Sequence, residues 1–312
     1  MKVVVTGGAG FIGANLCRRL LVTEGVDEVV ALDDLSSGAA DRIEGTAASL
    51  VVADMGDSAV LDDVLPGTTV VVHLGARPSV PRSIEDPRAS HHANATGTLE
   101  VLEGVRRHAV ARVVVASSSS VYGQNPVLPK HEDLTPMPLS PYAVSKLAAE
   151  GYALANARCF GFGALALRFF NVFGPLQPAG HAYAAVIPAF VSAALAGQPV
   201  TVHGDGAQTR DFTYVGTVCD VLAGAVVQAV VHPQPVNLAF GSRSSLLEVL
   251  TLLEELLGHP IERVHVAERA GDVRDSQADQ TRLRSLFGSV EPIDLREGLA
   301  RTVEWFRTGE VR

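Results

Sequence analysis

One stretch of sequence decides the fold: Lys2-Val-Val-Val-Thr-Gly-Gly-Ala-Gly-Phe-Ile-Gly13. A short β-branched run leads directly into Gly7, Gly10 and Gly13, and the residues from Gly8 to Gly13 also satisfy the G-x-G-x-x-G pattern. Glycines at this spacing permit a tight strand-to-helix turn, let backbone amides approach a pyrophosphate, and place the phosphates at the positive end of the helix. The stretch therefore predicts a dinucleotide-binding turn, with a glycine turn that binds nothing as the plainer alternative.

Short apolar runs alternate with longer helix-compatible segments through the first half of the chain. The expected strands are Val3–Val5, Glu28–Leu32, Leu50–Ala53, Thr69–His73, Arg112–Ala116 and Ala164–Phe169. Such alternation predicts βαβ units, and near-continuous apolar runs are typical of strands buried on both faces of a parallel sheet. The expected fold class is α/β, a doubly wound parallel sheet (Rossmann) with a smaller C-terminal substrate-binding region.

The length of 312 residues suits one large domain or two unequal ones. We expect residues 1–170 to form the dinucleotide-binding Rossmann domain. Proline- and glycine-rich loops become more frequent from about residue 171, so residues 171–312 are expected to be mainly a substrate-binding region. A segment near residues 211–232 is expected to return to the first domain as a helix.

Composition and charge exclude several functional classes. A net charge of −9 argues against binding to nucleic acid, which requires clustered Lys and Arg. Cys17, Cys159 and Cys219 are scattered and odd in number, which predicts neither a disulfide framework nor a metal site and favours the cytoplasm. The N-terminal strand is not a secretory signal, and the apolar stretch Val221 to Val231 is shorter than the roughly 20 residues that span a bilayer, so we expect no membrane partner.

Acidic and small residues follow the expected strands. Asp33 or Asp34, after the second strand, can accept hydrogen bonds from the adenosine ribose hydroxyls and would repel a 2′-phosphate, which favours NAD over NADP. Asp54 after the third strand can accept from the adenine amino group, and Leu74-Gly-Ala76 leaves room for a cofactor after the fourth. Solvated turns and plain loops are the alternatives, and Asn94 is open between helix packing and cofactor binding.

A tyrosine and a lysine four residues apart supply the candidate chemistry. Tyr142 and Lys146 share one face of a helix whose start is signalled by Ser140 at the N-cap and Pro141 at the first helical position. The ammonium of Lys146 is expected to favour the ionised phenol of Tyr142. The cluster Ser117-Ser-Ser-Ser-Val-Tyr-Gly123 offers a hydroxyl that can relay a proton to Tyr142. A serine-rich loop by itself does not indicate a function.

In this combination the chain resembles the extended short-chain dehydrogenase/reductase family, and within it the NAD-dependent nucleotide-sugar epimerases typified by UDP-glucose 4-epimerase. The similarity runs from Lys2 to about Gly288. Beyond the motifs above, it includes Arg168-Phe-Phe-Asn-Val-Phe-Gly-Pro175, Gly204-Asp-Gly-Ala-Gln-Thr-Arg-Asp-Phe212 and Arg269-Ala-Gly-Asp272. The resemblance implies NAD as cofactor and a UDP-sugar as substrate.

The resemblance also implies roles for individual residues. Ser118 is implied as the catalytic hydroxyl, Tyr142 as the base and Lys146 as its partner, in an oxidation to a 4-keto sugar followed by return of hydride to the opposite face. The implied NAD contacts are Gly7, Gly10, Phe11, Ile12, Gly13, Asp33, Asp34, Ser37, Gly38, Asp54, Met55, Leu74, Ala76, Asn94, Tyr142, Lys146 and Phe169. The implied substrate contacts are Ser118, Ser119, Ser120, Tyr142, Asn171, Ala185, Val186, Thr201, His203, Arg210, Arg269, Asp272 and Ser276.

Other functions on the same scaffold fit the residues less well. Sugar-nucleotide 4,6-dehydratases place an acidic pair where this chain has Ser119 and Ser120, and UDP-glucuronate decarboxylases carry Glu at the position of Ser120. A one-way reductase would exchange NADPH, which the acidic turn at Asp33 disfavours. A non-catalytic dinucleotide-binding scaffold would not need the set of Ser118, Tyr142 and Lys146.

Departures from the family pattern bear on the sugar. Val215-Gly-Thr-Val218 replaces the usual Val-Asp-Asp-Val, Phe169 replaces a tyrosine, and Ala185 and Ser276 are smaller than the residues of glucose/galactose enzymes. A larger pocket favours UDP-N-acetylhexosamine or a UDP-uronic acid. Because the serines from Ser118 to Ser120 can donate to a carboxylate, we favour UDP-glucuronate/UDP-galacturonate, with UDP-N-acetylglucosamine and UDP-glucose as alternatives.

Oligomeric state is suggested only by the same resemblance. Helices Pro87–His108 and Tyr142–Ala157 resemble those that form a four-helix dimer interface in the family. Symmetric dimers are the commonest soluble assemblies, so we expect a homodimer. The apolar faces of these helices can also be satisfied within one chain.

Overall fold

A seven-stranded parallel sheet forms the centre of the molecule, a computed structural model that describes residues 1–180, 184–268 and 273–311. The strands, in spatial order, are β3 (Ser49–Val52), β2 (Glu28–Asp33), β1 (Lys2–Thr6), β4 (Thr68–His73), β5 (Arg112–Ser118), β6 (Gly163–Phe169) and β11 (Val236–Leu238). The expected doubly wound α/β fold is confirmed. The order reverses between β1 and β4, and a crevice at such a switch point is where ligands bind in this class of fold.

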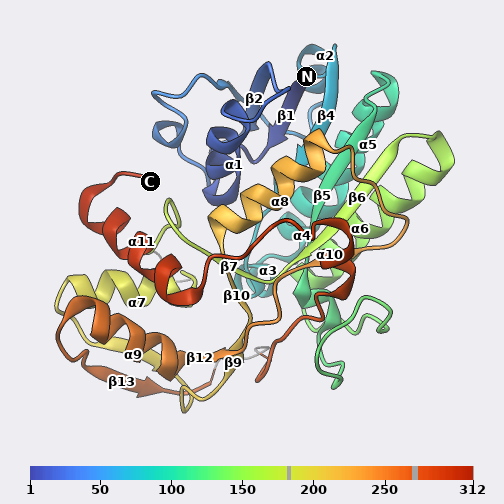
Figure 1. Cartoon of the computed structure of the whole chain (residues 1–312). Coiled ribbons are helices and arrows are strands. Elements are labelled where there is room, and N and C mark those ends of the chain that lie inside the picture. The colour runs from blue at the N-terminus through green and yellow to red at the C-terminus, as the bar shows by residue number, and fades with distance from the viewer. Residues whose placement is uncertain (181–183, 269–272, 312) are drawn as a thin grey trace.

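Helices cover both faces of the sheet (Figure 1). Along β1, Val3 and Val5 pack in one cluster with α1 and α8, whereas Val4 packs in a second cluster with α2, α5 and α6. This alternation follows from the two-residue period of a strand, and it explains why the strand sequences are apolar throughout. The helix bounds are α1 (Phe11–Leu21), α2 (Ser58–Val64), α5 (Gly97–Arg107), α6 (Pro141–Phe160) and α8 (Val215–Val227).

The long helix α6 begins where the sequence indicated. Ser140 caps it by accepting a hydrogen bond from the backbone amide of Ala143 at 3.2 Å, and Pro141 occupies the first turn. Gly161, in the left-handed conformation with φ of 80°, ends it. Five short helices precede α6 in the chain: η1 (Ala40–Arg42), α3 (Val80–Glu85), α4 (Pro87–His91), η2 (His92–Thr96) and η3 (Ser119–Tyr122).

Smaller paired strands and helices build much of the second half. The pairs are β7 (Asn171–Phe173) with β10 (Phe212–Tyr214), β9 (Thr209–Arg210) with β12 (Ser244–Ser245), and β8 (Val200–His203) with β13 (Arg263–Val266). The helices are α7 (Val186–Leu195), α9 (Leu246–Leu257), α10 (Thr281–Leu286) and α11 (Leu295–Thr308). One apolar cluster continues from α1 and α8 into α7, α9 and α11, so the two halves share a core.

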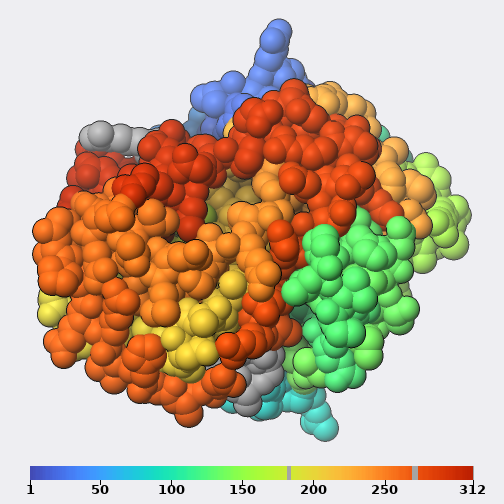
Figure 2. Space-filling model, turned by 60° about the horizontal axis from the view of Figure 1, so that its bottom comes forward, coloured from blue at the N-terminus to red at the C-terminus, as the bar shows by residue number. Residues whose placement is uncertain are grey.

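Two elements from the second half join the sheet layer of the first. Helix α8 packs on α1, where Arg19 Nε donates to Asp220 Oδ1 at 2.7 Å, and β11 pairs with β6. On the surface, residues of the C-terminal part lie beside the loop between β5 and α6 (Figure 2). There the backbone amide of Lys130 donates to the Gln277 carbonyl at 2.7 Å. In the part of the chain that the structure describes, no helix has both the length and the apolar character needed to cross a membrane.

Candidate active site

The glycine-rich turn between β1 and α1 approaches its neighbours so closely that side chains do not fit. Gly7 has φ of +66°, and a Cβ atom there would lie 2.8 Å from the backbone nitrogen of Gly75. A Cβ atom on Gly13 would lie 2.0 Å from the Gly7 carbonyl oxygen. The turn therefore leaves a hollow lined by backbone at the N-terminus of α1, as pyrophosphate binding requires.

A cavity of about 580 Å³, here called the turn cavity, opens above this turn. It reaches from the end of β2 to the start of α6. Twelve of the expected NAD residues line it: Gly7, Gly10, Phe11, Ile12, Gly13, Asp33, Ser37, Leu74, Ala76, Tyr142, Lys146 and Phe169. The structure thus brings together residues that are up to 162 positions apart in the chain, counted from Gly7 to Phe169.

Of the acidic pair, Asp33 is the inner carboxylate. It is buried, its Oδ2 accepts from the amide of Ala9 at 3.0 Å and its Oδ1 accepts from the amide of Leu35 at 2.8 Å. Burial raises the pKa of Asp33, and the two amide hydrogen bonds lower it again in part. Gly38 does not line the turn cavity; a Cβ atom there would lie 2.6 Å from Asp33 Oδ1, so Gly38 leaves room for the carboxylate.

A second cavity of about 720 Å³, the edge cavity, continues from Asp33 along the ends of β2 and β3. Asp34, Asp54 and Met55 line it, as expected for residues near an adenosine. Asn94 does not line any of the three cavities described in this subsection. Its Oδ1 accepts from the amide of Arg77 at 2.7 Å and its Nδ2 donates to Ser145 Oγ at 2.9 Å, which favours the helix-packing alternative.

The candidate catalytic groups meet at the end of β5. Lys146 is buried, and its Nζ donates to the carbonyl of Ala116 at 2.9 Å. Tyr142 is half-buried, and its hydroxyl lies within hydrogen-bonding reach of the Ser118 hydroxyl. All three side chains line the turn cavity.

Burial decides the protonation of these groups in the ligand-free protein. It raises the pKa of Tyr142 above its ordinary value, and the hydrogen bond with Ser118 lowers that pKa in part. It also lowers the pKa of Lys146 to about 8. In the ligand-free protein the ammonium donates to the Ala116 carbonyl, and desolvation is the larger effect on the pKa of Tyr142. That Lys146 favours the ionised phenol stays a prediction.

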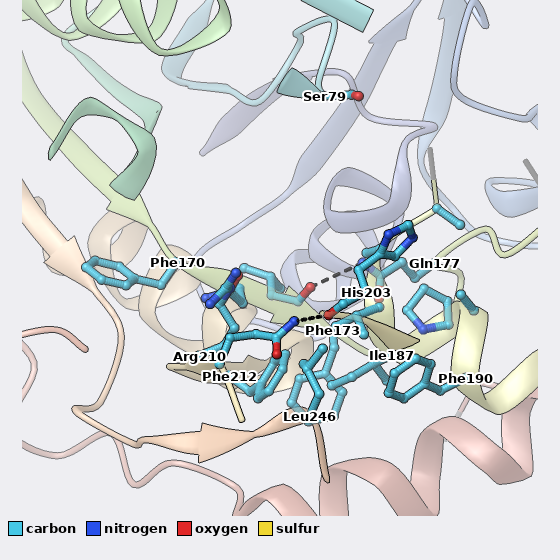
Figure 3. A pocket seen from close by; sticks show the side chains of 18 of the residues that line it. Ser79, Phe170, Phe173, Gln177, Ile187, Phe190, His203, Arg210, Phe212 and Leu246 are labelled. Atoms are coloured by element: carbon cyan, nitrogen blue, oxygen red, sulfur yellow. Dashed lines mark hydrogen bonds between the residues drawn. The ribbon is translucent and has the colours of Figure 1, made fainter. Parts of the chain in front are cut away.

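A third cavity, the loop cavity of about 450 Å³, lies between β7, α7, β8 and β9 (Figure 3). Seven of the expected substrate residues line it: Tyr142, Asn171, Ala185, Val186, Thr201, His203 and Arg210. Arg210 is buried and donates from Nη1 to the carbonyls of Thr209 at 2.9 Å and Arg274 at 3.0 Å. These bonds hold a guanidinium group at the wall of the loop cavity.

The turn cavity and the loop cavity meet at Tyr142. The residues that line both are Ser79, Tyr142, Phe170, Val172, Gln177 and Ala185. Of these, Ser79, Phe170, Val172 and Gln177 were not predicted from the sequence. Only Ser79 could have been noticed in the sequence, because a serine two residues before a proline is typical of a helix N-cap, and Ser79 does cap α3. Its φ of 102° is unusual for a residue that has a side chain.

Several expected substrate residues lie elsewhere. Ser119 and Ser120 do not line the three cavities, because the chain turns away as η3 and Ser120 Oγ donates to Ser118 Oγ at 2.9 Å. Ser276 is buried, and its amide donates to the Thr209 carbonyl at 3.1 Å, so it supports Arg210's strand rather than widening the loop cavity. Arg269 and Asp272 lie outside the described residues.

Fold and site together define a class of protein: a Rossmann-fold enzyme of the short-chain dehydrogenase/reductase type, with its tyrosine and lysine beside a dinucleotide turn. A sequence profile described as "NAD dependent epimerase/dehydratase family" matches residues 3–239. The chain belongs to this family, and its cofactor is NAD.

Three relatives show how far the similarity extends. A UDP-glucose 4-epimerase of Mycolicibacterium smegmatis is 38% identical, over 98% of this chain and 99% of the relative. The structure of a UDP-N-acetylglucosamine 4-epimerase from Methanobrevibacter ruminantium M1 is similar with a TM-score of 0.92 and 33% identity, covering 99% of both chains. The structure of MoeE5 in complex with UDP-glucuronic acid and NAD is similar with a TM-score of 0.88 and 37% identity, covering 99% of this chain and 100% of that chain.

The residues of this chain fit NAD. The side-chain-free turn at Gly7 and Gly13 suits the pyrophosphate, and the carboxylate of Asp33 lies at the end of β2, where the adenosine ribose is bound in this fold. Arg42 and Arg82, which the sequence analysis also missed, line the same cavity and add positive charge near the turn. Within the described ranges, no cluster of His, Cys, Asp and Glu is arranged to hold a metal ion.

Gly13→Ala tests the turn. We expect the variant to retain less than about a tenth of the NAD that the unaltered protein retains, because the new Cβ would collide with the Gly7 carbonyl and displace the pyrophosphate hollow. The NAD released on denaturation, per mole of chain, measures this. Gly151→Ala is the matched control, since a Cβ at Gly151 meets no atom within 4 Å. Equal NAD in the Gly13 and Gly151 variants would contradict the assignment.

Proposed function

We propose that the chain interconverts the C4 epimers of a UDP-hexose with NAD as internal oxidant. One observation carries the proposal: Tyr142, with Ser118 and Lys146, lies where the turn cavity meets the loop cavity. A sugar joined to a nucleotide in the loop cavity would extend toward the phenol. Relatives named as 4-epimerases of UDP-sugars support the same reaction.

Proton transfer at C4 falls to Tyr142. NAD⁺ held in the turn cavity would supply the oxidant, a group that can accept hydride from C4 and give it back. The phenolate takes the proton of the 4-hydroxyl as the hydride leaves, which yields a 4-keto sugar, and gives it back when hydride adds to the other face. Ser118 donates to the reacting oxygen, and the positive charge of Lys146 stabilises the phenolate against the burial that raises its pKa.

Inversion requires that the sugar turns while the nucleotide stays in place. Arg210 suits the diphosphate, because a guanidinium group binds phosphate through two parallel hydrogen bonds. At the junction of the cavities, Phe170, Val172 and Ala185 are apolar, whereas Ser79, Tyr142 and Gln177 are polar. Charged contacts to the diphosphate and uncharged side chains around the sugar favour rotation of the ketone. Arg269 and Asp272 are proposed as further UDP contacts on the resemblance alone.

For the sugar we propose a uronate, UDP-glucuronate/UDP-galacturonate. Of Ser118, Ser119 and Ser120, Ser118 alone lines the turn cavity, and its oxygen accepts a hydrogen bond from the Ser120 hydroxyl. Hydroxyl groups can donate to a C6 carboxylate. MoeE5, one of the similar structures, was solved with UDP-glucuronic acid, although also with UDP-glucose.

UDP-N-acetylglucosamine is the second candidate. Ala185 lies at the junction of the turn cavity and the loop cavity, where a methyl side chain leaves space for a bulky substituent on the sugar. The similar structure from Methanobrevibacter ruminantium M1 is named a 4-epimerase of this substrate. Dehydration is less favoured than either epimerisation, since Ser119 and Ser120 stand where dehydratases carry acids.

A substrate panel separates these sugars. We expect turnover of UDP-glucuronate without added NAD, and kcat/KM at least about tenfold higher than for UDP-glucose, the equivalent of one hydrogen bond to the carboxylate. Initial rates with UDP-glucuronate, UDP-N-acetylglucosamine and UDP-glucose, followed by chromatography of the epimers, measure this. A preference for the N-acetylated sugar would support the second candidate, and a preference for UDP-glucose would contradict the enlarged site.

We also propose that the protein is a cytoplasmic homodimer formed through α4, α5 and α6. Helix α6 exposes three large apolar or aromatic side chains, Val144 at 53%, Tyr152 at 42% and Phe160 at 50%. So much exposed apolar surface on one helix indicates a contact with another molecule. Light scattering after gel filtration is expected to give about twice the chain mass of 32.7 kDa, and a monomeric mass would contradict the proposal. The three cysteines form no disulfide, which suits a reducing compartment.

Tyr142→Phe tests the base. We expect kcat to fall by about 10²- to 10⁴-fold, because phenylalanine cannot accept the proton, while NAD is retained. Tyr152→Phe on the exposed side of the same helix is the control and is expected to keep full activity. Full activity of the Tyr142 variant would remove this residue from the role of base.

A further inference from the structure

A buried ion pair lies behind the active site, and the proposed mechanism does not use it. Arg168 on β6 and Glu150 on α6 are 2% and 4% exposed. Arg168 donates from Nη2 to Glu150 Oε1 at 2.7 Å and from Nε to Oε2 at 2.9 Å, and Ser117 Oγ donates to the same Oε2 at 2.7 Å. The carboxylate is thus bound by three donors from two strands.

Glu150 belongs to a polar stripe on α6. Tyr142, Lys146 and Glu150 are spaced by four residues, so they lie along one side of the helix. Each meets the end of β5: the Tyr142 hydroxyl lies near Ser118, Lys146 Nζ donates to the carbonyl of residue 116, and Glu150 accepts from residue 117. Three successive residues of one strand therefore bind three successive turns of one helix.

The arginine that holds Glu150 is itself fixed. Its guanidinium lies over the ring of Tyr122, 4.8 Å from the ring centroid, and Tyr122 Oη donates to Asn237 Oδ1 at 2.6 Å. Asn237 is on β11, next to β6 in the sheet, and is fully buried. Arg168 is also directly opposite Ser117 in the register of β5 and β6. The ion pair consequently joins α6 to a rigid part of the sheet.

We propose that Glu150 is a positioning residue, whose bidentate pairing with Arg168 fixes the register of α6 on β5 so that the Tyr142 hydroxyl meets Ser118. This inference rests on the proposed role of Tyr142 as base. A helix advances 1.5 Å and turns 100° per residue, so a small slip of α6 would separate the two hydroxyls. Apolar contacts alone resist such a slip poorly, because α6 is rich in alanine, whose small side chains interlock little with their neighbours.

The nature of the contact argues for positioning more than for stability. Burying two charges costs desolvation, and well-packed apolar residues of similar volume are often at least as stabilising. Two parallel hydrogen bonds, in contrast, are satisfied in only one alignment of the helix and the strand. The ion pair therefore fixes the alignment of α6 with the strands, which apolar packing does not.

Glu150→Gln is the first test. An amide accepts through one oxygen only, so at least one of the two bonds from Arg168 is lost whichever way the amide is turned. We expect kcat to fall by about 10- to 100-fold, as for a misplaced catalytic group, with KM for the UDP-sugar within about twofold and with NAD retained. Glu297→Gln, in the exposed pair with Arg301, is the matched control and should leave all these values unchanged.

Titration of Tyr142 gives a readout that a purely structural role would not move. Loss of the Ser118 hydrogen bond removes an effect that lowers the phenol pKa, so the pKa rises. A base works only when deprotonated, and the rising limb of kcat against pH therefore moves to higher pH. We expect a shift of roughly 0.5 to 1 unit, the equivalent of one hydrogen bond. Tyrosinate absorbance, taken as the difference from the same protein carrying Tyr142→Phe, measures the pKa without substrate.

A double variant, Glu150→Leu with Arg168→Met, covers the case that the single variant does not fold. Apolar residues of similar volume are expected to restore the thermal midpoint but not kcat or the position of the pH limb. Either variant with a wild-type titration and wild-type kcat per folded site would overturn the inference, even if the thermal midpoint falls. If the unaltered protein turns over no UDP-hexose, the proposed function fails, whereas the tyrosinate titration still decides the positioning role.

Discussion

The whole site depends on one geometric constraint: parallel strands end at the same edge of their sheet. Strand order reverses between β1 and β4, which leaves a crevice at the ends of these two paired strands, and the glycines before α1 keep that crevice free of side chains. Every other part of the site is placed relative to that turn. Asp33, Ser118 and Phe169 each lie at the carboxyl end of a strand, so the fold brings them together with no direct contact required among them.

Burial has opposite consequences for the two halves of the candidate catalytic pair. It opposes charge on both Tyr142 and Lys146, and so it raises one pKa and lowers the other. In the ligand-free protein the phenol of Tyr142 is therefore protonated. A positive charge brought into the turn cavity would lower the pKa of the buried phenol strongly, because little solvent screens it.

Most of the sheet was predictable from the sequence because its strands are buried on both faces. Strands such as β4 and β5 must therefore have apolar residues on both faces. The helices that connect the strands can be located from their caps, such as Ser140 before α6. β11 was missed, since three residues carry no periodicity and become a strand only by pairing with β6. Asn94 was open between packing and cofactor binding, and in the fold its amide group is bonded to Arg77 and Ser145. Ser276 was expected to leave room for the sugar, yet it is buried with its backbone amide bonded to Thr209.

The sequence by itself determined the fold class, the dinucleotide turn and the placement of Tyr142 and Lys146 on one side of a helix, because these follow from local spacing and strand burial. Only the tertiary structure decided which groups share a cavity. Ser79 and Gln177 come to the junction of the turn cavity and the loop cavity from loops 98 positions apart, and Glu150 meets Arg168 across the boundary of helix and sheet. Such contacts depend on how the elements pack together, and neither the spacing nor the composition of one segment contains that information.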